Sequence, residues 1–202
     1  MPVVRPEHCE YCFDTLLSHL DPVVYPKPAA PTFPDDEYPL FVTWNHQSRS
    51  GHLRLRGCIG TFSGVPLHEG LASYALTSAL KDRRFSPIRL AEVPKLACSV
   101  SLLTNFEEGK SAMDWELGTH GIWIEFHDTY GVKRTATYLP EIALEQGWSK
   151  IEALDSLLRK GGYQGKITDA VRYGIHLTRY QSQKTALTYQ EYLDRKTAAA
   201  AV

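Results

Sequence analysis

Three strand-like runs follow one another in the middle of the sequence, separated by turns rather than by helices. They are "ACSVSLL" from Ala97, "GIWIEFH" from Gly121 and "VKRTATYL" from Val132. Short runs rich in β-branched and aromatic residues are typical of strands. Parallel strands need a crossover connection, usually a helix, so this succession favours an antiparallel sheet over a doubly wound parallel one.

Helical periodicity marks three other segments. Apolar residues recur at helical spacing between Cys9 and Leu20 and again over residues 67–80, where "KDRRFSPI" ends the helix. The clearest helix is "SKIEALDSLLRKGG", in which Ser149 and Glu152 form a capping-box pattern. The remaining predicted strands span residues 40–47, 52–62 and 174–183, and "SRSG" turns the first of these into the second.

The chain of 202 residues is long enough to bury a core as one domain or as two small lobes. We expect a single domain over residues 1–195. Within it, residues 22–39 hold six of the twelve prolines and are expected to form a connector loop. Residues 196–202 are expected to be a flexible tail.

The overall charge limits the classes of partner. The formal net charge is −1, so the chain lacks the basic excess that nucleic-acid binding exploits. No apolar run approaches the roughly 18 residues of a membrane span, and the N-terminus does not resemble a secretory leader. We therefore expect a soluble, intracellular protein of the cytoplasm, the nucleus or both, with no membrane partner and no support for a nucleic-acid partner.

Cys9 and Cys12 form a CxxC pair, a spacing found in zinc sites and redox motifs. The sequence holds no second CxxC that could complete a structural zinc site. Both cysteines also belong to the apolar stripe of the first predicted helix, and we favour a role in the core. The eight histidines show no metal-ligand spacing, so no metal site is expected. No cofactor is expected either.

The stretch "LRLRGCIGTF", Leu53 to Phe62, is unusual for a strand because glycines weaken strand interiors. Strand alternation would place Arg56 and Cys58 on one face, where a guanidinium favours a thiolate. Gly60 would leave an open space on that face for a ligand or a partner. The alternative is that Cys58 is a small core residue and that the glycines accommodate a crossing helix or a bulge.

Several blocks of the sequence resemble the AMMECR domain family in the same order along nearly the whole chain. They are "LRGCIGTF", "YALTSALKDRRFSPI", "CSVSLLTNFE", "GTHGIWIEF", "ATYLPEIALEQGW", "LLRKGGY" and "LTRYQS". Lys81 and Gly161 depart from the residues expected in these blocks. The resemblance implies an α+β fold, with antiparallel sheets flanked by helices in a larger and a smaller lobe. It implies no settled activity, although prokaryotic relatives occur beside or fused to Memo-like proteins and radical SAM enzymes.

An enzyme built on this sequence would use Cys58 as a nucleophile or covalent carrier and would need a base. His120, in the turn "GTHGI", and Glu145, in "LEQGW", are the leading candidates. The alternatives are a turn histidine bonded to the backbone and a solvated carboxylate.

Arg83, Arg84 and Phe85 follow the helix that ends near residue 80, where cations complement the helix dipole. Their functional alternative is a corner that binds an anion or a partner, with Arg83 favoured over Arg84.

The sequence contains no GxGxxG after a strand, no Walker loop, no GxSxG and no HExxH. We therefore favour a binding or adaptor module for a protein partner or a small anionic ligand over an enzyme that uses Cys58. The expected ligand- or partner-binding residues are Arg56, Gly57, Ile59, Gly60, Arg83 and Phe85.

Overall fold

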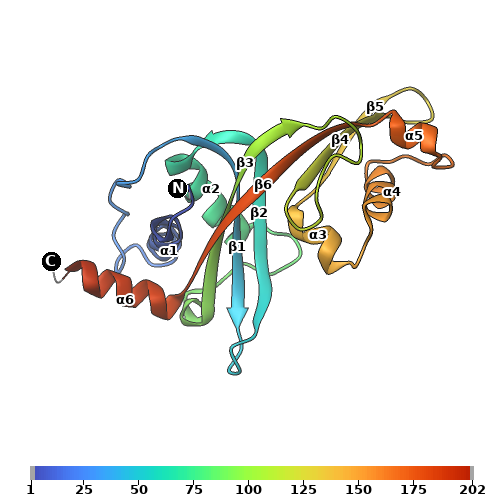
Figure 1. Ribbon diagram of the computed structural model, residues 1–202. Helices are drawn as coiled ribbons and strands as arrows, with labels where there is room; N and C mark the ends of the chain where they lie inside the picture. The colour runs from blue at the N-terminus through green and yellow to red at the C-terminus, as the bar shows by residue number, and fades with distance from the viewer. Residues whose placement is uncertain (1–2, 201–202) are drawn as a thin grey trace. The chain divides into compact units, whose positions relative to one another are not determined.

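Six strands form one hydrogen-bonded series in the computed structural model, which describes residues 3–200 (Figure 1). The strands are β1 (Glu37–Gln47), β2 (Leu53–Pro66), β3 (Leu96–Glu108), β4 (Gly121–His127), β5 (Lys133–Tyr138) and β6 (His176–Thr188). Hydrogen bonds join them in the order β2-β1-β3-β6-β4-β5. The pairs β1–β2, β1–β3, β4–β5 and β4–β6 are antiparallel, which confirms the predicted class of sheet.

The helices account for the α part of the α+β fold. They are α1 (Pro6–Leu20), α2 (Leu67–Leu80), α3 (Pro140–Glu145), α4 (Lys150–Lys160), α5 (Asp169–Tyr173) and α6 (Tyr189–Ala200), with a short 3₁₀ helix η1 (Leu90–Lys95). Within residues 3–200, no helix is long and apolar enough to cross a membrane. Residues 196–200 of the expected tail belong to α6, and residues 201 and 202 lie outside the described residues.

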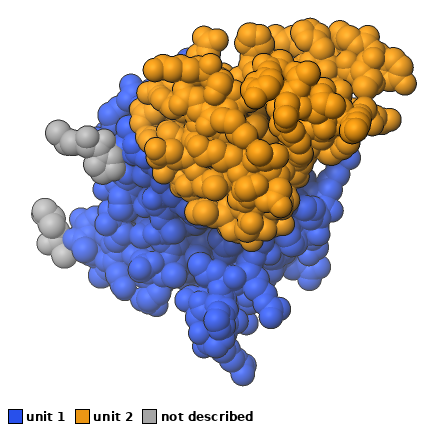
Figure 2. Space-filling model, turned by 45° about the vertical axis from the view of Figure 1, so that its right-hand side comes forward, with its two compact units in different colours: residues 1–102, 183–202 blue, residues 103–182 orange. Residues whose placement is uncertain are grey.

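The chain divides into two compact units, drawn in blue and orange in Figure 2. Unit 1 comprises residues 1–102 and 183–202, and unit 2 comprises residues 103–182. Unit 1 is the larger, in line with the two lobes that the family resemblance implies. The β1–β2 hairpin extends beyond the rest of unit 1 (Figures 1 and 2).

The core of unit 1 lies between one face of its strands and two helices. Leu40, Val42 and Trp44 alternate along β1 and are fully buried, as a strand with one covered face requires. The Trp44 indole donates a hydrogen bond to the carbonyl of Ala75 in α2 (3.0 Å) and meets the ring of Phe13 in α1 edge to face. Both α1 and α2 therefore pack on this face.

The CxxC pair is part of this core. Cys9 and Cys12 are fully buried, and the Cys9 thiol donates to the carbonyl of Cys98 (3.5 Å). The Cys12 thiol donates to the carbonyl of Leu71 (3.9 Å). Burial raises the pKa of the Cys12 and Cys98 thiols, so both stay protonated at neutral pH. The predicted core role of Cys9 and Cys12 is confirmed.

The proline-rich segment packs against α1 and α2 through the side chain of Phe33. The ring of Phe33 is buried and meets the rings of His8 and His68 edge to face. The Phe33 carbonyl oxygen lies 2.7 Å from Nε2 of His68. Burial lowers the pKa of His8 to about 4, so this imidazole is neutral at pH 7. Strand β1 begins at Glu37, so the last residues of the expected loop are extended and paired.

In unit 2 the core lies between β4 and α4. Leu154, Leu157 and Leu158 form the fully buried stripe of α4, in a cluster with Ile124 and Phe126 of β4. The helix begins at the predicted cap, because the Ser149 hydroxyl accepts from the Glu152 N–H while the Glu152 carboxylate accepts from the Ser149 N–H.

Replacing Ser149 with alanine is expected to lower the free energy of unfolding by about 1 kcal/mol, because the first turn of α4 loses its acceptor. Ser149→Asp restores an acceptor and should recover most of this loss. Urea unfolding followed by circular dichroism measures both variants. Equal destabilisation by alanine and aspartate would show that the cap is not the cause.

Candidate functional site

The glycine-rich motif lies on β2, at one end of the strand order, and contains a bulge. Trp44 pairs with Gly57 and the next residue of β1, Asn45, pairs with Leu55, which leaves Arg56 without an opposing residue. A bulge interrupts the two-residue alternation of a strand. Strand alternation alone therefore does not fix the face of Arg56 relative to that of Cys58.

Arg56 is held by partners on a following segment. Its guanidinium donates two hydrogen bonds to the carboxylate of Glu92 (3.0 and 3.2 Å) and a third to the carbonyl of Ser86 (2.7 Å). A bidentate pair of this kind fixes the orientation of both side chains. Arg56 thus anchors η1 and the preceding loop to β2.

Close packing explains the glycines of the motif. A methyl group at Gly57 would overlap the carbonyl oxygen of Ser78, because α2 crosses the strand there. At Gly60 it would overlap the carbonyl of Leu40 and lie 2.5 Å from the ring of Phe41. The open space expected beside Gly60 is therefore wrong, since Phe41 fills it. The alternative, a crossing helix and a bulge, is confirmed.

Cys58 is the one half-exposed cysteine of the four, and the other three are buried. The Thr43 hydroxyl donates to its sulfur (3.1 Å). Its backbone N–H donates to the Asp82 carboxylate (2.9 Å), and its carbonyl accepts from the Arg84 guanidinium (3.2 Å). The backbone N–H and C=O groups of Cys58 thus find their hydrogen-bond partners in Asp82 and Arg84, on the side of β2 away from β1.

Asp82 is the buried centre of this arrangement. Its carboxylate accepts from the backbone N–H groups of Cys58 and Arg84 and from two nitrogens of the Arg84 guanidinium (2.7 and 3.0 Å). The hydrogen bonds from the Arg84 guanidinium hold the pKa of Asp82 well below its usual range, despite the opposing effect of burial. The cation nearest the Cys58 carbonyl is therefore already paired with an anion.

These contacts keep residues 82–92 along the outer edge of β2. Four residues of the segment bond to Cys58 or Arg56: Asp82, Arg84, Ser86 and Glu92. The predicted residue Phe85 lies half-buried in this segment, with the Arg84 guanidinium 5.5 Å from its ring centroid. Ile59 of β2 is also half-buried, opposite Val42.

Besides Arg84, which is paired with Asp82, three exposed arginines and three exposed leucines lie in β2 before the bulge and in residues 83–90. We call this surface the basic edge; its members are Leu53, Arg54, Leu55, Arg83, Arg89 and Leu90. None of its arginines forms an ion pair with any residue between 3 and 200. Leu53 is 52% exposed and Leu55 is 42% exposed, so the surface combines free cations with apolar side chains.

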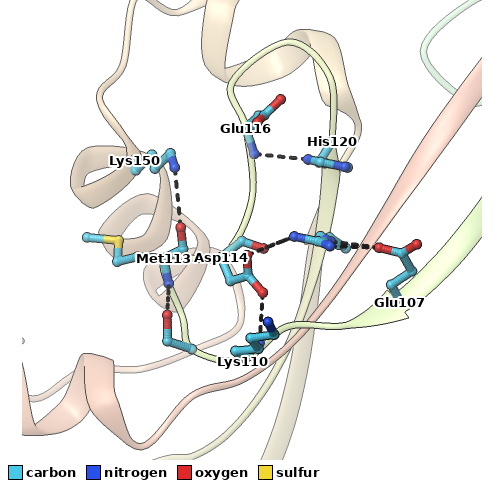
Figure 3. A network of polar contacts seen from close by, with 9 residues as sticks. Glu107, Lys110, Met113, Asp114, Glu116, His120 and Lys150 are labelled. Atoms are coloured by element: carbon cyan, nitrogen blue, oxygen red, sulfur yellow. Dashed lines mark hydrogen bonds and ion pairs between the residues drawn. The ribbon is translucent and has the colours of Figure 1, made fainter.

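The candidate bases His120 and Glu145 belong to unit 2, whereas Cys58 belongs to unit 1. Nδ1 of His120 accepts a hydrogen bond from the Glu116 N–H (3.0 Å), as Figure 3 shows. This is the backbone-bonded turn histidine of the alternative interpretation. Glu145 is the last residue of α3 and its side chain is exposed.

The loop that carries His120 is organised by a different residue, Arg179 of β6. Its guanidinium donates to the carboxylates of Glu107 and Asp114 (2.8 Å each), and Asp114 also accepts from the Lys110 N–H (2.9 Å; Figure 3). The single positive charge of Arg179 is shared by two carboxylates. The network therefore fixes the loop.

Sequence reasoning missed Asp82 and Glu92 and ranked Arg83 above Arg84. Asp82 stands directly before the arginine pair, but nothing in the local pattern shows that its carboxylate turns back to an earlier strand. Within the described part of the chain, no three His, Cys, Asp or Glu residues are grouped so as to hold a metal ion.

Alkylation of the folded protein with iodoacetamide is expected to modify Cys58, while Cys9, Cys12 and Cys98 react only after unfolding, because the last three are buried. Peptide mass spectrometry gives the four rates in one sample. Repeating the alkylation over a range of pH gives the pH dependence of each of the four rates. Equal protection of all four cysteines would contradict the half-exposed position of Cys58.

Comparisons with known proteins cover most of the chain. The family model described as AMMECR1 matches residues 9–185. An uncharacterized protein of Arabidopsis thaliana is 53% identical over 188 residues, which cover 93% of this chain and 86% of that protein. One of Schizosaccharomyces pombe is 40% identical over 191 residues, which cover 94% and 95%.

A solved structure supports the fold. The crystal structure of an uncharacterized protein from Pyrococcus horikoshii superposes with a TM-score of 0.66 at 23% identity, covering 91% of this chain and 93% of that chain. The names of these relatives assign no activity.

Proposed function

The chain belongs to the AMMECR1 family, and we propose that it acts as a protein-binding module whose contact surface is the basic edge. One observation carries the proposal. In a chain with a formal net charge of −1, three exposed arginines without ion pairs and three exposed leucines lie on two segments, β2 before the bulge and residues 83–90, that Arg56 joins through Ser86 and Glu92. Arginine and exposed apolar side chains together are typical of contact surfaces between proteins.

The chemistry of the surface suggests its partner. Free guanidinium groups favour carboxylates, with which they form two parallel hydrogen bonds. Leu53 and Leu55 add apolar area that gains from being covered. The partner is therefore an acidic segment of a protein that also carries apolar side chains. Arg83 and Phe85 keep the binding role expected of them, and Arg56 supports the surface by holding residues 86 and 92.

An enzyme that uses Cys58 is the second candidate, favoured by the accessibility of this thiol alone. Within residues 3–200, Thr43 is the side chain hydrogen-bonded to the thiol, and it is not a base. The nearby Arg84 is neutralised by Asp82. A catalytic cysteine needs a base or an unpaired cation, so the contacts favour binding.

Reversing two charges, Arg83→Glu with Arg89→Glu, is expected to weaken binding of the partner roughly ten-fold or more, because like charges would then face each other. Cys58→Ser should leave the dissociation constant within about two-fold, because serine still accepts from Thr43. The partner is first recovered by affinity purification and is then purified separately. Titration calorimetry at two salt concentrations measures the dissociation constant of each variant.

Lys27→Glu with Lys166→Glu is the matched control, since both lysines are exposed, lie outside the basic edge and form no ion pair with residues 3–200. Equal weakening by the control, or no weakening by the Arg83 and Arg89 changes, would contradict the proposal. Loss of a covalent adduct or of turnover in Cys58→Ser alone would favour the enzyme instead.

A further inference from the structure

Ser86 lies at the surface, in the second segment of the basic edge. Residues 83–87, "RRFSP", run between two buried residues, Asp82 and Ile88. Ser86 itself is exposed, and its hydroxyl forms no hydrogen bond with any residue between 3 and 200. The side chain of this serine is therefore available to an enzyme.

The backbone at Ser86 is restricted and held in place. Pro87 follows it, and a residue before proline is confined to extended conformations. Residues 86–89 accordingly belong to no helix or turn. The Ser86 carbonyl accepts a hydrogen bond from the Arg56 guanidinium (2.7 Å). The residue is thus anchored through its backbone, while its hydroxyl has no structural role.

Two arginines precede this hydroxyl. Arg83 and Arg84 stand three and two residues before Ser86. Protein kinases choose among hydroxyls by the charge pattern around them, and carboxylates of an arginine-directed kinase pair with such side chains. Arg83 is exposed and forms no ion pair with residues 3–200, so it is free for this contact, whereas Arg84 is paired with Asp82. A free hydroxyl and a free recognition cation therefore occur together.

We propose that Ser86 is a phosphorylation site for an arginine-directed serine kinase, and that its phosphate weakens binding of the acidic partner. The second part rests on the proposed function of the basic edge. In the transfer, the Ser86 hydroxyl oxygen bonds to the γ-phosphorus of ATP while the bond from that phosphorus to the β–γ bridging oxygen breaks. ADP leaves, and the hydroxyl proton passes to the catalytic aspartate of the kinase.

The effect on binding follows from charge. Arg54, Arg83 and Arg89 together carry three positive charges. Phosphoserine carries about −1.5 to −2 charges at pH 7, so it offsets half or more of them. Arg83 and Arg89 each stand three residues from Ser86, at most roughly 11 Å along the chain. Guanidinium groups bind phosphate oxygens as they bind carboxylates, so the phosphate competes with the acidic partner.

The first test treats the full chain with Mg-ATP and a purified kinase that requires arginine three residues before its target serine. Peptide mass spectrometry is expected to find Ser86 phosphorylated. Ser63, an exposed serine with no arginine within three residues, is the internal control and should remain unmodified. Arg83→Gln should lower the rate at Ser86 roughly ten-fold or more, because the recognition cation is lost. No phosphate on Ser86, or an unchanged rate in Arg83→Gln, would overturn the assignment.

Phosphoserine placed at position 86 by genetic code expansion tests the effect on binding. The probe is the partner purified for the Arg83 and Arg89 measurements, titrated by calorimetry. Binding is expected to weaken roughly five-fold at about 0.15 M salt and less at about 1 M salt, where charges are screened. Ser86→Ala and phosphoserine at position 63 are the controls and should each bind within about two-fold of the unmodified chain.

Unchanged binding by the chain phosphorylated at position 86, or equal weakening by phosphate at position 63, would overturn the regulatory effect. These results differ from a failure of the basic edge, in which reversing the charges of Arg83 and Arg89 would itself leave binding unchanged. In that case the kinase assay still decides whether Ser86 is a modification site.

Discussion

Replacing Gly57 with alanine is expected to lower the free energy of unfolding by about 3 kcal/mol or more. The added methyl group would overlap the carbonyl oxygen of Ser78, which belongs to the backbone of α2 and cannot rotate away like a side chain. Overpacking in a core typically costs about 1–3 kcal/mol, and a backbone obstacle places this site at the upper end. Chemical denaturation with two spectroscopic probes measures the change.

Gly64→Ala is the matched control on the same strand. A methyl group there would lie 3.7 Å from the Glu37 side chain, which is an ordinary contact, and Gly64 is exposed. This variant should be neutral or slightly stabilising, because alanine reduces the entropy of the unfolded chain. Equal losses at Gly57 and Gly64 would contradict the account of the motif as a helix crossing.

Asp82→Asn is expected to cost about 2 kcal/mol of unfolding free energy. The amide cannot match the charge-assisted hydrogen bonds that the carboxylate accepts from Arg84, and its NH₂ group faces other donors. Asp169→Asn is the control, because that carboxylate is paired with Arg172 but lies 80% exposed. It should change stability by a few tenths of a kcal/mol at most.

The same variant should alter the dependence of stability on pH. The pKa of Asp82 is lower in the folded chain than the roughly 3.9 of an unfolded aspartate. Its stabilising contribution is therefore complete above about pH 4 and is lost as the pH falls below that value. Asp82→Asn should accordingly show a shallower loss of stability in acid than the unmodified chain, whereas Asp169→Asn should follow the unmodified curve.

Local patterns predicted the elements of this fold well. Strand β4 spans the predicted residues 121–127, and α2 spans the predicted residues 67–80. The cap at Ser149 depends on a residue three positions away, so the sequence carries the whole signal. The core role of Cys9 and Cys12 follows from helical spacing, which also depends on near neighbours alone.

The candidate site depends on contacts between distant residues, which the sequence pattern does not encode. Gly57 needs to be glycine because of Ser78, and Arg56 is drawn into a bulge beside Glu92, thirty-six positions later. Strand alternation assumes an uninterrupted ladder, so it could not reveal that bulge. The family resemblance contained no information on which arginine is paired.

The ion pair of Arg84 with Asp82 also changes how the two adjacent arginines are interpreted. Arg84, ranked second from the sequence, is bound to Asp82 and to the backbone of Cys58. Arg83, ranked first, forms no ion pair with residues 3–200 and is exposed. Arg84 therefore has a structural role, whereas the adjacent Arg83 is available to a partner. That difference is the reason for placing the proposed contact on Arg83 and Arg89 rather than on Arg84 or on Arg56, which is paired with Glu92.

The most direct test of the binding proposal is site-specific photo-cross-linking in living cells. A benzophenone amino acid replaces Leu55 in the full chain, and a second sample carries it at Tyr130, which is 88% exposed in unit 2. We predict one dominant cross-linked protein from position 55, none of it from position 130, and its loss when Arg83 and Arg89 are changed to glutamate. The same products from both positions, or a product that persists after the charge reversal, would contradict the proposal that the basic edge is the contact surface.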